Sequence, residues 1–199
     1  TTTINTIINM FEEQELEVLL AAPTGRAAKR MSEATGKEAQ TLHRLLEIEF
    51  VGEDARRQSF NKNEENPIEA DVLIVDEMSM VDVLLMNSLL KAMVPGQQLV
   101  LVGDADQLPS VGPGNVLKDI INSKKIKVVR LDKVFRQARE SDIVMNAHRI
   151  NKGEYPVYNK KNTDFFFMQR ASQAELVDTL VELVTKRLPK FQKCDPLID

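Results

Sequence analysis

The chain has 199 residues, 43% of them hydrophobic and 28% charged, with a formal net charge of −4. No apolar run approaches the roughly 18 residues of a membrane-spanning helix, so the composition is typical of a soluble globular protein. A single cysteine, Cys194, excludes an internal disulfide framework and favours the reducing cytoplasm. With only two histidines it also excludes a closed zinc site of the usual kind. The acidic balance leaves a nucleic-acid partner open, because a local basic patch is sufficient to attract one.

A helix is expected over residues 1–11. Its apolar residues recur at helical spacing, at Ile4, Ile7, Ile8 and Phe11. No strand precedes this helix, although an α/β unit normally enters such a helix from a strand. We therefore expect the chain to begin inside a unit, and a capped surface helix at a true terminus is the alternative.

A short strand over residues 17–22 is expected to lead into the turn Pro23-Thr24-Gly25-Arg26. Thr24 is a candidate N-cap for the helix that follows, and Gly36 a candidate stop. A threonine, a glycine and an arginine at a strand end offer N–H groups and positive charge to a phosphate. A solvated helix face is the alternative for residues 26–30.

Residues 41–46 are expected to form a short capped helix with its leucines on one side. His43 and Arg44 would then face solvent or a ligand. Residues 47–69 become polar and indicate a loop or a small projecting hairpin inserted between elements of the sheet.

The most informative stretch is residues 71–79, where four aliphatic residues run into Asp76 and Glu77. A continuous apolar run indicates a strand buried on both faces, as in a parallel sheet covered by helices. Ligands of such sheets bind at the carboxyl ends of the strands. Two carboxylates there suit Mg²⁺ and an attacking water, whereas a solvated acidic turn is the alternative.

A second buried strand, residues 98–102, ends in Gly103 and Asp104, with Gln107 close behind. Between the two strands lies a helix carrying Val83 to Met93, for which Ser79 is the expected N-cap. Two strands therefore deliver polar residues to one edge of the sheet, which is how a phosphate and metal site is assembled.

The remaining chain continues with alternating elements. We expect helices over residues 115–122 and 141–150, strands over 126–131 and 164–168, and a long amphipathic helix with a capping box at Ser172.

Five segments in this order resemble the RecD-type branch of superfamily 1 DNA helicases, which includes the exonuclease V alpha subunit. They are residues 20–28 (LAAPTGRAA), 41–46 (TLHRLL), 75–80 (VDEMSM), 101–114 (LVGDADQLPSVGPG) and 134–137 (VFRQ). The resemblance implies an α/β fold: a RecA-like P-loop NTPase lobe with a mostly parallel sheet flanked by helices, plus the start of a second such lobe. It places the first lobe in residues 1–135, including the insert at 47–69, and the second in 136–199.

The resemblance also implies ATP and Mg²⁺ as cofactors and single-stranded DNA as the partner. The implied catalytic residues are Asp76, Glu77, Gln107 and Arg136; the nucleotide-binding residues are Thr1, Asp104 and Gln137, with Thr1 and Asp76 holding Mg²⁺. The implied DNA-binding residues are Pro23, Thr24, Gly25, Arg26 and His43. Other exonuclease V subunits are a further expected partner.

Thr1 occupies the position that follows Gly-Lys in the family's phosphate-binding loop, and that loop is missing from the sequence. We therefore expect these 199 residues alone to bind ATP poorly and to hydrolyse almost none. Two other interpretations stay open: a non-catalytic nucleic-acid-binding or docking module on a RecA-like lobe, and a metal-dependent phosphatase or other NTPase sharing only the acidic strand.

Overall fold

The computed structural model describes residues 2–50, 58–131, 141–158 and 163–192. It divides into two compact units, Thr1–Arg130 and Leu131–Asp199. The predicted domain boundary between residues 135 and 136 lies outside the described residues.

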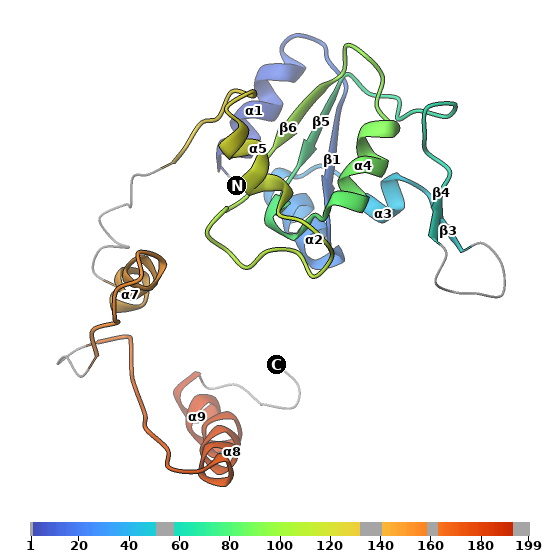
Figure 1. Ribbon diagram of the computed structural model, residues 1–199. Coiled ribbons are helices and arrows are strands. Elements are labelled where there is room, and N and C mark those ends of the chain that lie inside the picture. Colours follow the sequence, from blue (N-terminus) through green and yellow to red (C-terminus); the bar gives the residue numbers. More distant parts are fainter. Residues whose placement is uncertain (1, 51–57, 132–140, 159–162, 193–199) are drawn as a thin grey trace. The chain divides into compact units, whose positions relative to one another are not determined.

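The first unit is built on a parallel sheet of four strands in the order β2-β1-β5-β6 (Figure 1). The strands are β1 (Val18–Ala22), β2 (Ala39–Thr41), β5 (Val72–Val75) and β6 (Gln98–Leu101). β1 pairs with β2 on one side and with β5 on the other, and β5 pairs with β6. The predicted parallel α/β sheet is thus confirmed.

Helices cover both faces of this sheet. Successive side chains of a strand point to opposite faces, so the apolar strands present a hydrophobic surface on each side. One face packs on α1 (Thr2–Glu12) and α2 (Gly25–Thr35), through Ile4, Ile8, Leu20, Met31, Val72 and Ile74. The other packs on α3 (Leu42–Leu45), α4 (Val83–Lys91) and α5 (Val116–Ser123), through a cluster that includes Ala21, Leu42, Leu73, Val75, Leu85, Leu89 and Leu117. All four residues of β5 are buried, which explains its unbroken apolar run.

Short polar side chains fix the ends of these helices. Thr24 caps α2 as predicted, its Oγ1 accepting from the Ala27 N–H at 3.2 Å, and Gly36 ends it with a φ of 71°. The predicted cap of α4 is wrong: Asp82 accepts from the Leu85 N–H at 2.8 Å. Ser79 instead lies in a single 3₁₀ turn, η1 (Met78–Met80), that comes before α4.

The insert forms the predicted hairpin at its base. β3 (Ile48–Phe50) and β4 (Gln58–Phe60) are antiparallel, with Ile48 opposite Phe60. The strand β2 was not expected, since residues 39–41 carry no apolar run.

All the regular secondary structure in the described part of the second unit is helical. α7 (Asp142–Asn151) begins at the predicted cap Ser141, and α8 (Gln173–Glu182) begins at the predicted capping box of Ser172. α8 runs on through a π-helical turn, η2 (Leu183–Arg187), into α9 (Leu188–Gln192). No described helix in either unit is long and apolar enough to cross a membrane.

The N-terminus of α7 is tied to Asp164. The Ser141 hydroxyl donates to its Oδ2 at 2.5 Å and the Ile143 N–H donates to its Oδ1 at 3.1 Å. The Ser141 hydrogen bond lowers the pKa of this exposed carboxyl below its ordinary value, since it favours the charged form.

The two strands expected over residues 126–131 and 164–168 are wrong: both segments are irregular. Their large apolar side chains are exposed, Val129 by 77% and Phe166 by 74%. Among the described residues neither segment pairs with a neighbouring strand, and β-branched or aromatic content does not make a strand without one.

Candidate functional site

The order of the strands creates a crevice between β1 and β5. The chain leaves β1 towards β2 and leaves β5 in the opposite direction, towards β6. Open parallel sheets bind their ligands at such a switch point, outside the carboxyl ends of the strands. Here the two ends are Pro23-Thr24 after β1 and Asp76-Glu77 after β5.

Glu77 has an unusual backbone at this point. Its φ of 54° and ψ of 40° are left-handed, a conformation that costs a residue with a side chain about 1–2 kcal/mol. Hydrogen bonds on both sides hold it: the Glu77 N–H donates to Asp76 Oδ1 at 2.8 Å, and the Met78 N–H donates to the Val102 carbonyl at 3.0 Å. Strain kept at a pair of adjacent carboxylates is typical of a functional site.

Gly103 makes the second of these hydrogen bonds possible. A Cβ at residue 103 would lie 2.9 Å from the Met78 backbone nitrogen and 3.0 Å from Leu117 Cδ2. Because one of these contacts is backbone, it cannot be relieved by rotating a side chain. The end of β6 therefore approaches the turn after Glu77 only because residue 103 is glycine.

Asp76 and Glu77, both half-buried, line a pocket of about 190 Å³ with side chains of α1 and α2. The other lining residues are Ile4, Ala27, Arg30, Met31 and Thr35. The pocket thus combines two carboxylates and a hydroxyl with one guanidinium.

The donor set of this pocket fits a hard cation held partly by other ligands. No group of three or more His, Cys, Asp or Glu is placed to bind a metal within the described residues. Asp76 Oδ1 accepts from the Glu77 N–H, which leaves Oδ2 for a cation or its water. Mg²⁺ is usually bound in this way, by one or two carboxylates with waters and phosphate oxygens completing the shell.

Arg30 is the pocket residue for which the sequence indicates no role beyond a basic neighbourhood. Ala27, Met31 and Thr35 lie four residues apart on α2, and Arg30 lies three residues after Ala27, a spacing that puts neighbours on one side of a helix. That spacing could have identified Arg30 as a pocket residue, but a charged residue on an amphipathic helix is usually exposed to solvent.

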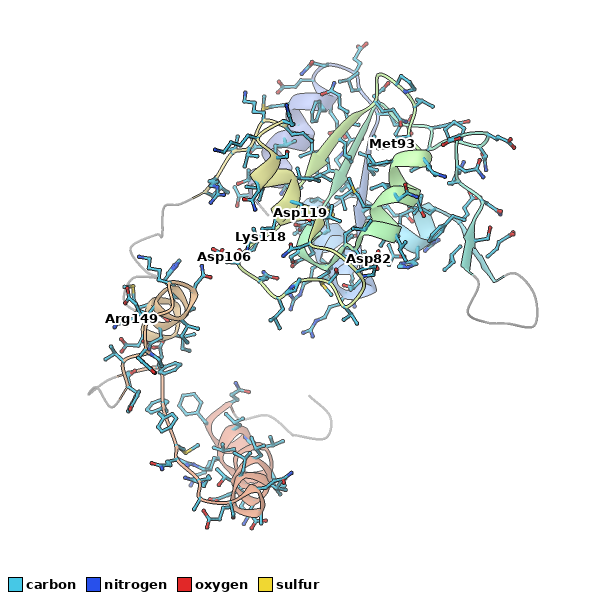
Figure 2. The ribbon with its side chains drawn as sticks, in the orientation of Figure 1. Asp82, Met93, Asp106, Lys118, Asp119 and Arg149 are labelled. Atoms are coloured by element: carbon cyan, nitrogen blue, oxygen red, sulfur yellow. The ribbon has the colours of Figure 1, made fainter. Side chains whose placement is uncertain are left out.

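The structure does not bring Gln107 into this pocket. It lies exposed in the loop after β6, where its N–H donates to the Asp104 carbonyl at 3.3 Å and the Asp106 N–H donates to Asp104 Oδ1 at 2.9 Å. Figure 2 labels Asp106 in this loop and Asp82 at the start of α4.

The far end of the same loop is attached to the start of α4. The Val83 N–H donates to the Pro113 carbonyl at 3.0 Å. A Cβ at Gly112 would overlap Asp82 Oδ2 at 1.9 Å, and a Cβ at Gly114, whose φ is 90°, would overlap Val83 Cγ2 at 2.3 Å. The Gln107 loop is therefore anchored to the helix that follows Asp76 and Glu77.

The residues predicted to bind DNA follow β1 and β2, which are neighbouring parallel strands whose carboxyl ends lie at the same edge of the sheet. Pro23 and Thr24 are half-buried, whereas Gly25 and Arg26 are exposed at the start of α2. His43 lies on α3, directly after β2, with its ring against Phe60. The remaining predicted residues, Thr1, Arg136 and Gln137, lie outside the described residues.

The profile of the AAA domain family matches residues 1–113, more than half of the chain. The chain belongs to the AAA domain family.

A similar protein, the ATP-dependent RecD2 DNA helicase of Deinococcus radiodurans, is 38% identical over 180 residues, covering 90% of this chain and 24% of the relative. The RecBCD enzyme subunit RecD of Mycobacterium tuberculosis is 38% identical over 175 residues, covering 76% of this chain and 28% of the relative. The resemblance of this AAA domain to RecD-type helicases is thereby confirmed.

The AAA domain chain spans about a quarter of the length of these relatives. Among solved structures, a Pif1 helicase from work on forked double-stranded DNA is 24% identical, with a TM-score of 0.48 over 90% of this chain and 44% of that one.

Proposed function

We propose that the protein is an ATP-dependent helicase or translocase that moves on single-stranded DNA in recombination and repair. The observation that carries this is the pocket at the switch point, where Asp76 and the left-handed Glu77 face side chains of α1 and α2. Family membership and the RecD-type relatives support it independently.

ATP and Mg²⁺ are the cofactors of this proposal. When bound, the metal would supply positive charge to the phosphates, and Asp76 Oδ2 and the Thr1 hydroxyl would hold it. Glu77 orients the attacking water and accepts its proton. The two adjacent carboxylates thus have different tasks within one pocket.

Four other residues complete the proposed nucleotide site. Gln107 senses the γ-phosphate through its loop, and Asp104, which organises that loop, belongs to the same nucleotide-responsive segment. Arg136 neutralises charge on the transferred phosphoryl group, the role that suits a guanidinium, and Gln137 lies beside it in sequence.

Single-stranded DNA is the proposed substrate of the sheet edge next to this pocket. Pro23, Thr24, Gly25 and Arg26 follow β1 and line the track, with little readout of bases. Gly25 and Arg26 offer backbone N–H groups to sugar and phosphate, and Arg26 adds positive charge. His43 follows the neighbouring strand β2 and lies along the same edge. A track along the edge that also holds Asp76 and Glu77 couples hydrolysis to movement on the strand.

Other exonuclease V subunits are proposed as further partners, because several relatives of this chain are named as the RecD subunit of the RecBCD enzyme. The cytoplasm is the proposed location, which the single cysteine supports.

The test is strand separation by the full-length protein on a forked duplex, with ATP and with a non-hydrolysable analogue. Arg26→Ala should weaken binding to single-stranded DNA and reduce the slope of log affinity against log salt by about 0.7, the single-strand value for one lost phosphate contact. Lys29→Ala, an exposed lysine further along the same helix, is the matched control and should leave both unchanged. DNA binding without DNA-stimulated hydrolysis or strand separation would support the docking module instead.

A further inference from the structure

His43 faces the hairpin rather than open solvent. Its ring centroid lies 6.0 Å from that of Phe60, with the planes tilted by 48°. This is the separation and tilt at which aromatic rings attract beyond simple burial. Within the described residues no hydrogen bond of the imidazole accompanies this contact, so the ring itself makes the interaction.

Phe60 is the point at which the hairpin meets the body of the first unit. It ends β4, pairs opposite Ile48 of β3, and packs against the core cluster that contains Leu42 and Leu45. Those two leucines occupy the buried side of α3, so His43, between them in sequence, contacts Phe60 from the same short helix.

The backbone on either side of this contact is also fixed. Thr41 caps α3, accepting from the Arg44 N–H at 3.2 Å, and Glu47 turns the chain with a left-handed φ of 53°. After β4, the N–H groups of Asn61 and Lys62 donate to the carbonyls of Glu47 and Leu46, each at 3.2 Å. Only residues 46 and 47 separate α3 from β3, so α3 and the hairpin base form one connected unit.

We propose that His43 is a positioning residue, whose ring packs on Phe60 to hold the β3–β4 hairpin at a fixed direction from the carboxyl end of β2. The contact itself does not depend on the proposed function. Only its consequence does, which is that the hairpin keeps a fixed position beside the DNA track. This packing gives His43 a role other than the phosphate contact implied by the resemblance, because the ring face, not a nitrogen, carries it.

Two substitutions separate these roles. His43→Phe keeps an aromatic ring but removes every nitrogen, whereas His43→Asn keeps hydrogen-bonding groups but removes the ring. The readout is hydrogen exchange of the full-length protein in peptides that contain Asn61 and Lys62, whose N–H groups close the hairpin base. Peptides from α4 are the internal reference.

If His43 positions the hairpin, His43→Asn should accelerate exchange at Asn61 and Lys62 by about three- to tenfold, the loss expected for an aromatic pair, and leave α4 unchanged. Phe60→Leu should do the same, and His43→Asn with Phe60→Leu together should add nothing further. His43→Phe, which keeps an aromatic ring against Phe60, should leave exchange at Asn61 and Lys62 at the wild-type rate.

The opposite pattern overturns the proposal: unchanged exchange at Asn61 and Lys62 in His43→Asn, or exchange in His43→Phe as fast as in His43→Asn. The exchange measurement needs neither ATP nor DNA. If the helicase proposal fails, the exchange measurement still tests the role of His43. If the role of His43 fails, strand separation still tests the helicase proposal.

Discussion

Glu77 shows how a single residue sets the geometry of this site. Its backbone is left-handed, and its side chain lines the same pocket as that of Asp76, its neighbour in sequence. The conformation depends on the hydrogen bond from the Met78 N–H to Val102, and that bond depends on the missing Cβ of Gly103. The carboxylate of Glu77 is therefore positioned by a residue 26 places later in the chain.

Gly103→Ala tests this dependence. The added methyl must displace the Met78 backbone or the end of β6, and a shift of about 1 Å costs on the order of 10²-fold in rate when it misplaces a reacting group. We expect ATP hydrolysis by the full-length protein to fall by this order in single-turnover kinetics, with nucleotide affinity nearly unchanged. A wild-type rate in a variant whose unfolding midpoint is also unchanged would contradict the account.

At the scale of elements, α2 connects the pocket to the proposed DNA track. Thr24 begins the helix at the end of β1, and Ala27, Arg30, Met31 and Thr35 line the pocket further along. The hydroxyl of Thr24 accepts from the Ala27 N–H, so this side chain caps α2 whether or not DNA is bound.

Thr24→Ala should lower the free energy of unfolding of the first unit by about 1 kcal/mol, because the Ala27 N–H loses its cap. Thr24→Ser retains the accepting oxygen and should lower it far less. Urea denaturation followed by circular dichroism measures both. Equal destabilisation by the two substitutions would show that the methyl group of Thr24, rather than its hydroxyl, matters.

The element α7 depends on one buried amide in the same way. Asn146 is 2% exposed, and its side chain donates to the Val157 carbonyl and accepts from the Val157 N–H, each at 2.7 Å. It therefore holds the segment after α7 as a neighbouring strand would.

Asn146→Leu removes both the donor and the acceptor of this side chain, so the N–H and the carbonyl of Val157 lose their hydrogen bonds. We expect a loss of about 2 kcal/mol in the stability of the second unit, within the range for unsatisfied buried groups. Asn146→Asp keeps the acceptor and loses the donor, so it tests the Val157 carbonyl separately. Hydrogen exchange at Val157 measures the effect, and a wild-type rate in Asn146→Leu would contradict it.

Over the whole molecule, the sequence predicts what depends on local pattern. The apolar runs located β1, β5 and β6, and the polar residues that follow β5 indicated the two carboxylates of the pocket. Helix spacing and short polar residues likewise located α1, α2, α7 and α8 with most of their caps.

What depends on contacts between distant segments was not predicted. β2 has no apolar run and exists because Ala39–Thr41 pairs with β1. Asp82 replaced Ser79 as a cap because the left-handed turn at Glu77 starts a 3₁₀ turn first. The contact of His43 with Phe60 joins residues 17 apart, which no local pattern indicates.

The central claim, that Asp76 and Glu77 form the hydrolytic half of a nucleotide site, is tested most directly by Glu77→Gln in the full-length protein. The amide keeps the size and loses the base, so hydrolysis should fall by about 10²–10⁴-fold while the dissociation constant for ATP stays near the wild-type value. Glu13→Gln, the same change at an exposed position after α1, should alter neither. Parallel loss of binding and hydrolysis in Glu77→Gln would contradict the claim and make Glu77 a structural residue.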